Sequence, residues 1–129
     1  MPSLLYVAVG GALGSVTRYL MGSATMGWAA LHWGTRFPVG TLVVNLLGCL
    51  LIGGIAGLAD KHALLSADAR LFLVTGVIGG FTTFSSFGLE TVMLLKGGDT
   101  GMAVAYVLAS VLAGVALVAL GWWAVGSPA

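Results

Sequence analysis

Long apolar stretches separated by short polar segments dominate this chain. Four of them, at about residues 3–22, 40–59, 71–95 and 101–124, each contain at most one charged residue. A helix rises about 1.5 Å per residue, so twenty residues cross the roughly 30 Å hydrocarbon core of a bilayer. The pattern therefore predicts an all-α integral membrane protein, with a single domain of four transmembrane helices over residues 1–129.

The middle of the third predicted span differs from its apolar flanks. In hydrocarbon, a broken backbone is tolerated only where protein buries it or where it lines a wet cavity. A break frees N–H groups on one half-helix and carbonyls on the other, which suit an anion and a cation respectively. We therefore predict a helix broken at mid-membrane that forms an ion site. The residues that weaken the helix are Gly76, Gly79 and Gly80, followed by the hydroxyl residues Thr82, Thr83, Ser85 and Ser86.

Two polar residues stand out inside the second and third spans. Asn45 is surrounded by Leu and Val, with Thr41 one turn earlier on the same helical face. An intramembrane Asn can hold helices together, or its two N–H groups can bind a dehydrated anion. Glu90 shares a face with Ser86 in the third span. We interpret Glu90 as a structural, hydrogen-bonded carboxylate rather than a proton-coupling one.

The first and fourth spans offer further candidates. Arg18 lies near the end of the first span, where it either snorkels to the interface or lines an anion entrance. Tyr106, Ser110 and Gly114 recur every four residues in the fourth span and form a thin polar line. That line is either incidental or part of a pore lining.

Pairs of glycines four residues apart predict close helix packing in two spans. Gly10 and Gly14 have this spacing in the first span, and Gly53 and Gly57 have it in the second. Because glycine has no side chain, such pairs let a second helix approach closely. We expect packing rather than ligand binding at these positions.

Composition supports the membrane assignment and narrows the function. The 129 residues are 59% hydrophobic and 7% charged, with a mean hydropathy of +1.08 and a net charge of +1. A net charge so close to zero does not favour binding to nucleic acid. Cys49 is the only cysteine, so no intrachain disulfide forms. His32 and His62 fall in predicted loops at 23–39 and 60–70, where we expect solvated side chains rather than a metal pair. No catalytic constellation is expected at membrane depth, so an enzyme is not predicted.

The distribution of basic residues bears on orientation and assembly. Four spans put both termini on one side, together with Lys61 and Arg70, whereas Arg18, Arg36 and Lys96 lie on the opposite side. Because the Lys and Arg bias fixes orientation, so balanced a chain is expected to insert both ways. An antiparallel, dual-topology homodimer would place two copies of the break at mid-membrane, related by an in-plane two-fold axis.

Two motifs resemble the Fluc/CrcB family of fluoride ion channels. GTLVVNLLG at 40–48 and GGFTTFSSFGLET at 79–91 are similar to that family's signatures, and the similarity extends over essentially the whole chain. The resemblance implies a dual-topology homodimer in the bacterial inner membrane, with two antiparallel pores that passively export cytoplasmic fluoride and protect the cell. It also implies a structural sodium ion at the dimer centre, held by backbone carbonyls that map to Gly79 and Thr82.

The resemblance further implies which side chains face fluoride. Fluoride is small and strongly hydrated, so N–H donors, hydroxyls and the positive edges of phenyl rings must replace its water. Gly114 stands where relatives carry a second serine. The implied pore residues are Asn45 and Thr41, the phenylalanines Phe84 and Phe87, the polar track Ser86, Glu90, Thr91, Tyr106 and Ser110, and Arg18 at an entrance.

A small multidrug-type, proton-coupled antiporter is the main alternative, since it too is built from four short helices in a dual-topology dimer. Such a pump needs a membrane-buried carboxylate, yet the first span contains no Asp or Glu and Glu90 lies near a membrane edge. A structural assembly subunit that conducts nothing by itself is the other alternative.

Overall fold

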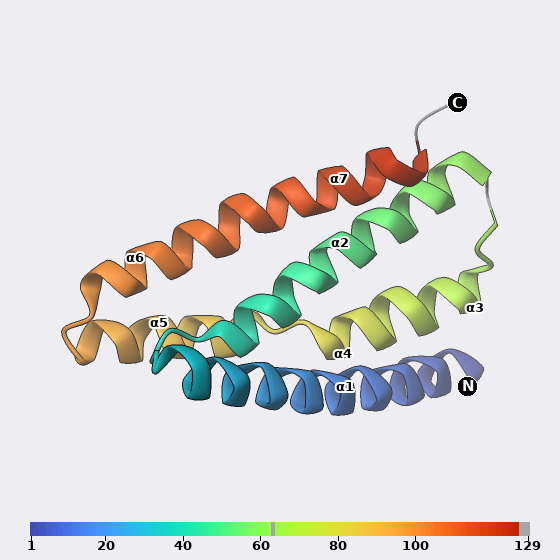
Figure 1. Ribbon diagram of the computed structural model, residues 1–129. Coiled ribbons are helices and arrows are strands. Elements are labelled where there is room, and N and C mark those ends of the chain that lie inside the picture. The colour runs from blue at the N-terminus through green and yellow to red at the C-terminus, as the bar shows by residue number, and fades with distance from the viewer. Residues whose placement is uncertain (63, 127–129) are drawn as a thin grey trace.

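The computed structural model describes residues 1–62 and 64–126, and these form four helical rods without any strand (Figure 1). All four rods are long and apolar enough to cross a membrane, which confirms the predicted all-helical class and its four spans. The rods are α1 (Pro2–Trp33); α2 (Val39–His62); α3 (Ala67–Arg70), the π-helical η1 (Leu71–Ile78), α4 (Gly79–Phe81) and α5 (Phe84–Lys96); and α6 (Thr100–Leu108), the π-helical η2 (Ala109–Ala113) and α7 (Gly114–Gly126).

The first helix is longer than the sequence pattern predicted. We expected it to end at Gly22, but α1 continues to Trp33 and is terminated by Gly34, which adopts the left-handed conformation with φ 57°. The expected loop over residues 23–39 is therefore wrong for its first part, because nothing before Gly34 stops the helix. His32 belongs to α1 rather than to a loop, and His62 is the last residue of α2.

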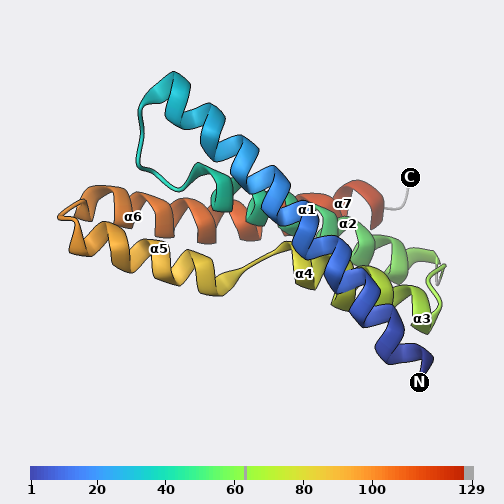
Figure 2. The ribbon, with the colours of Figure 1, turned by 90° about the horizontal axis from the view of Figure 1, so that it is seen from below.

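The extra length of α1 shapes one end of the molecule. Its 32 residues span about 48 Å at 1.5 Å per residue, more than the roughly 30 Å hydrocarbon core requires. Figure 2 shows its C-terminal part diverging from α5 and α6. Trp28 and Trp33 lie there with ring centroids 5.0 Å apart, each at least half exposed. The diverging end leaves room for a cavity, described below.

Glycines bring α1 into backbone contact with the third rod. A Cβ placed on Gly10 would lie against the Phe72 carbonyl oxygen, and one on Gly14 would lie against the Val77 carbonyl oxygen. Gly80 faces α1 in the same way, across the carbonyl of Gly11. The predicted role of Gly10 and Gly14 in helix packing is confirmed.

A second glycine seam joins α2 to α7, which run side by side in Figure 1. A Cβ on Gly53 would meet the Val118 carbonyl oxygen, and one on Gly57 would lie 2.7 Å from the Trp122 carbonyl oxygen. Gly121 makes the reciprocal approach to the α2 backbone at Leu50. The packing predicted for Gly53 and Gly57 is likewise confirmed.

Replacing Gly14 by Ala is expected to destabilise the fold, whereas replacing Gly11 by Ala is not. The new methyl at position 14 would lie closer than 3.0 Å to backbone atoms of Val77 and Phe81, and at position 11 it would meet nothing within 4 Å. Overpacking against backbone costs about 1–3 kcal/mol. Thermal unfolding of the two purified variants in detergent measures the difference. Equal melting temperatures would contradict this account of the α1 interface.

Large apolar side chains cover the outside of the rods. Leu4 and Leu13 of α1, and Leu112 and Leu120 of the fourth rod, are each more than half exposed. A water-soluble monomer rarely exposes so much contiguous apolar surface. These faces are suited to contact lipid chains or a second copy of the protein.

Candidate functional site

Helical structure in the third rod is interrupted between α4 and α5 (Figure 1). Thr82 (φ −84°, ψ 157°) and Thr83 (φ −149°, ψ 118°) adopt extended conformations, and α5 begins at Phe84. The N–H and the hydroxyl of Thr82 both donate to the Ile78 carbonyl, each at 3.0 Å. A helix interruption leaves other backbone groups without helical partners, and these must be satisfied from elsewhere.

Asn45 of α2 satisfies both backbone polar groups of Thr83. Its Nδ2 donates to the Thr83 carbonyl at 2.9 Å, and its Oδ1 accepts from the Thr83 N–H at 2.8 Å. One of the two N–H bonds of the Asn45 amide is therefore committed to the backbone, which leaves the other for a ligand. We call this pair of hydrogen bonds between Asn45 and Thr83 the Asn45 clamp. In a continuous helix the Thr83 N–H would bond to the Gly79 carbonyl, so the Asn45 clamp also deprives the Gly79 carbonyl of its helical donor.

The Thr83 side chain caps the start of α5. Its Oγ1 accepts from the Ser86 N–H at 3.2 Å and donates to Ser86 Oγ at 3.1 Å. This is the usual role of a threonine at an N-cap. The Ser86 N–H would bond to the Thr82 carbonyl in a continuous helix, so the cap removes that partner too. The carbonyls of Gly79 and Thr82, the two predicted cation ligands, have thus both lost their helical donors.

Glu90 is the centre of a second polar cluster, which joins three helices. Thr41 of α2 donates to Glu90 Oε1 at 2.7 Å, and Tyr106 of α6 donates to Glu90 Oε2 at 2.7 Å. Tyr106 is fully buried, and its ring packs edge-on against Phe37 and Phe87. Both carboxylate oxygens are engaged by hydroxyl donors, as expected of a structural carboxylate. Hydrogen bonds to a charged group contribute about 1.5–3 kcal/mol each.

The two phenylalanines after the break occupy different surroundings. Their ring centroids lie 5.5 Å apart. Phe84 is 84% exposed, whereas Phe87 is partly buried against Tyr106 at a centroid distance of 5.2 Å. Within one chain, Phe87 is thus a packing residue as well as a candidate anion contact. Because Phe84 is mostly exposed, replacing its ring would remove little packing within the chain.

A cavity of about 340 Å³, here called the break cavity, lies beside the interruption. The residues that line it come from three rods: Asn45 from α2; Thr83, Phe84 and Phe87 from the third rod; and Ser110 from the fourth rod. The Ser110 Oγ is buried and makes no hydrogen bond within the described ranges 1–62 and 64–126. The wall of the cavity therefore contains a hydroxyl without a hydrogen-bond partner and two phenyl rings.

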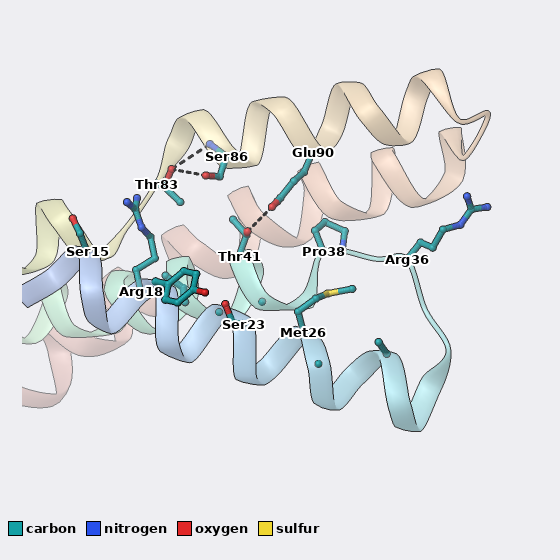
Figure 3. Close-up of a pocket in the computed structure, with 16 residues that line it drawn as sticks. Ser15, Arg18, Ser23, Met26, Arg36, Pro38, Thr41, Thr83, Ser86 and Glu90 are labelled. Atoms are coloured by element: carbon teal, nitrogen blue, oxygen red, sulfur yellow. Dashed lines mark hydrogen bonds between the residues drawn. The ribbon is translucent and has the colours of Figure 1, made fainter.

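A larger cavity of about 710 Å³, here called the mouth cavity, opens under the diverging end of α1. Figure 3 shows Arg18 and Arg36 toward opposite ends of it, with Thr41 and Glu90 between them. Ser86 and Thr83 complete the wall nearest the break. Thr83, at the interruption, lines both cavities.

The structure brings together nearly all the site residues predicted from sequence. Arg18, Thr41, Ser86 and Glu90 line the mouth cavity, and Asn45, Thr82, Phe84, Phe87 and Ser110 line the break cavity, with Tyr106 bonded to Glu90 behind them. Thr91 and Gly79 line neither cavity. The Thr91 hydroxyl donates to the Phe87 carbonyl of its own helix at 2.7 Å.

Sequence reasoning gave too little weight to Thr83 and Cys49. Thr83 is the residue on which the Asn45 clamp and the helix cap converge. Threonine is among the residues preferred at an N-cap, so a Thr directly before the helix that starts at Phe84 was a detectable signal. Cys49 lines the break cavity one turn after Asn45. A cysteine in an apolar run gives no comparable signal.

Comparison with known proteins shows which family the chain belongs to. The family model described as "CrcB-like protein, Camphor Resistance (CrcB)" matches residues 5–122. A protein of Methylobacillus flagellatus is 47% identical over 95% of this chain and 93% of its own length, and one of Agrobacterium fabrum is 48% identical over 94% of each. A Thermus thermophilus relative is 49% identical over 92% of this chain and 89% of its own. All three relatives are named fluoride-specific ion channel FluC. This chain is a multi-pass membrane protein that belongs to the CrcB family.

Proposed function

We propose that this protein is a fluoride-specific ion channel that passively releases cytoplasmic fluoride across the inner membrane and so lowers its toxicity. The relatives named fluoride-specific ion channels share almost half of its residues over nearly its full length. The observation in the molecule that carries the proposal is that Thr83, beside the interrupted helix, lines two cavities with polar residues in their walls.

The chemistry of the break cavity suits a small dehydrated anion. A fluoride ion that sheds water needs compensating donors, or it pays a large desolvation cost. The second N–H of Asn45 and the unpartnered Ser110 hydroxyl are such donors. The edges of Phe84 and Phe87 carry partial positive charge and can face the ion. Ser86 and Thr41 extend the polar lining toward the mouth.

The working unit in this proposal is an antiparallel homodimer. A Phe84 ring that is 84% exposed, next to a break in an apolar rod, needs cover from either lipid or a second chain. An inverted second copy would supply it and is consistent with the balanced basic residues, two on one side and three on the other.

Reporter fusions to the C-terminus test this topology. We expect both orientations in one cell population, because the charge bias is too small to fix one. Adding three Lys residues at positions 64–66 should lock one orientation and abolish fluoride resistance. An oppositely locked copy should restore resistance when co-expressed. A reporter active on one side only would contradict dual topology.

We further propose that a sodium ion sits between the two breaks of the dimer. The carbonyls of Gly79 and Thr82 have lost their helical donors to the Asn45 and Thr83 side chains, and backbone carbonyls are suitable ligands for a hard cation. A cation there would also favour a nearby anion. Thr82→Ser keeps the carbonyl and should keep sodium dependence. Fluoride efflux that is unchanged when potassium replaces all sodium would argue against this ion.

Anion efflux from liposomes tests the function directly. The purified full-length protein is reconstituted, and fluoride and chloride release are recorded with selective electrodes under a matched potassium gradient. We expect rapid fluoride release and none of chloride above protein-free vesicles. Fluoride release that requires an opposing proton gradient would point to a coupled antiporter, and release of neither ion would leave a structural subunit.

A further inference from the structure

Basic residues outnumber acidic ones in the lining of the mouth cavity. Its charged lining residues are Arg18, Arg36 and Glu90. Both oxygens of Glu90 already accept hydrogen bonds, from Thr41 and Tyr106. Within the described part of the chain, Arg18 makes no ion pair or hydrogen bond. Two cations and one hydrogen-bonded carboxylate therefore line the mouth cavity.

Arg36 differs from Arg18 because it has an acidic neighbour. Its Nη2 lies 3.7 Å from Oδ2 of Asp99, in the turn between α5 and α6. The Arg36 side chain is 80% exposed and that of Asp99 is 28% exposed. Asp99 is held in place by its own N–H, which donates to the Leu94 carbonyl at 2.9 Å. Its carboxylate does not cap α6, so it faces Arg36 without a competing backbone bond.

The two residues also share a smaller cavity beside the mouth. This cavity, of about 240 Å³, is lined by Arg36, Asp99 and Glu90. Arg36 and Glu90 line the mouth cavity as well. Arg36 therefore lines both cavities, and Asp99 lies beside it in the smaller one.

We propose that Arg36 collects anions at the mouth and that Asp99 sets how strongly it does so. This inference rests on the proposed fluoride conduction. An exposed pair at 3.7 Å contributes little to the stability of the fold. Its electrostatic effect is larger: the carboxylate converts an isolated positive charge into a dipole, whose attraction for a distant anion falls off faster.

The expected size of the effect follows from Coulomb's law. A unit charge about 8 Å from the path of an ion in water changes the local concentration of that ion about two- to threefold. The effect is nearly unscreened at 10 mM ionic strength, where the Debye length is about 30 Å, and is lost at 1 M, where it is about 3 Å. A conduction rate measured at limiting fluoride concentration follows this local concentration.

The test uses the full-length channel in liposomes at limiting fluoride, with sodium fixed and ionic strength varied with N-methylglucamine gluconate. At about 10 mM ionic strength we expect Asp99→Asn to raise fluoride efflux about two- to threefold and Arg36→Gln to lower it by a similar factor. The double variant should return close to the parent rate, because its net charge is unchanged. All differences should disappear near 1 M. Asp68→Asn, an exposed acid on α3 outside both cavities, is the matched control and should change nothing.

A structural role for the pair gives a different result. If the pair only fastened the α1–α2 connection to the α5–α6 turn, both single variants and the double variant would be slowed alike, at every ionic strength. That outcome, or unchanged efflux in both single variants at low ionic strength, would overturn the proposal. Absence of fluoride efflux from the parent protein would instead overturn the proposed function.

Discussion

Replacing Asn45 by Asp is expected to reduce fluoride efflux at least about a hundredfold, equivalent to about 2.7 kcal/mol in the barrier. The substitution removes the Nδ2 donor that now binds the Thr83 carbonyl at 2.9 Å and sets a carboxylate oxygen against that carbonyl. It also removes the second N–H and adds negative charge to the break cavity, where an anion must pass. Loss of a single donor to a charged group already costs about 1.5–3 kcal/mol. Efflux from liposomes provides the measurement.

Two controls separate conduction from folding in this experiment. Size-exclusion chromatography and circular dichroism report whether the Asn45→Asp protein keeps its assembly and helicity. Asn45→Leu removes the same donors without adding charge, so it should also lose efflux, but less completely. Near-normal efflux from a correctly assembled Asn45→Asp variant would show that Asn45 does not contact the ion in the pore.

Replacing Phe84 by Ile is expected to lower fluoride efflux at least about tenfold, or 1.4 kcal/mol in the barrier, without loss of chain stability. Ile keeps apolar bulk but lacks the positive ring edge that can face an anion. Phe84 is 84% exposed within the chain, so little intrachain packing changes. Phe87→Ile should cause a similar loss of efflux. It should also lower the melting temperature, because its edge-on contact with Tyr106 contributes about 0.5–1.5 kcal/mol.

Leu89→Ile serves as the matched control for both phenylalanine variants. Leu89 lies on the same helix, is 62% exposed and lines neither cavity, so efflux should stay at the parent level. If Phe84→Ile and Phe87→Ile also conduct at that level, the rings only pack. The proposed ring contact with fluoride would then be wrong.

Much of the fold was predictable because hydrocarbon imposes simple rules on sequence. Apolar length gave the four spans, and glycine spacing gave the α1 and α2 packing seams that the structure confirms. The end of α1 was not predictable by the same rule. Bilayer thickness sets the minimum number of residues that a crossing needs, but it does not set where a helix ends. Here α1 ends at Gly34, which adopts a left-handed conformation.

The sequence allowed us to predict which residues line the candidate site, but not which residues they bond to. Sequence placed Asn45 and Glu90 among polar residues of the spans, yet their partners lie 38 and 49 residues away along the chain, at Thr83 and Thr41. No local pattern reveals that an amide side chain will bond to the backbone of another helix. Such pairings depend on how far each helix is rotated and shifted, which only the packed structure determines.

The Asn45 clamp has a consequence for how the chain is made. During synthesis, α2 leaves the ribosome before the third rod, so the amide that will bind Thr83 is already present when the interrupted segment reaches the membrane. An interrupted helix entering lipid alone would expose unbonded N–H and carbonyl groups at a cost of several kcal/mol each. Pairing with an earlier helix removes part of that cost during insertion. The order of the helices along the chain is thus itself an aid to membrane biogenesis, and a circular permutant that begins with the third rod should insert poorly.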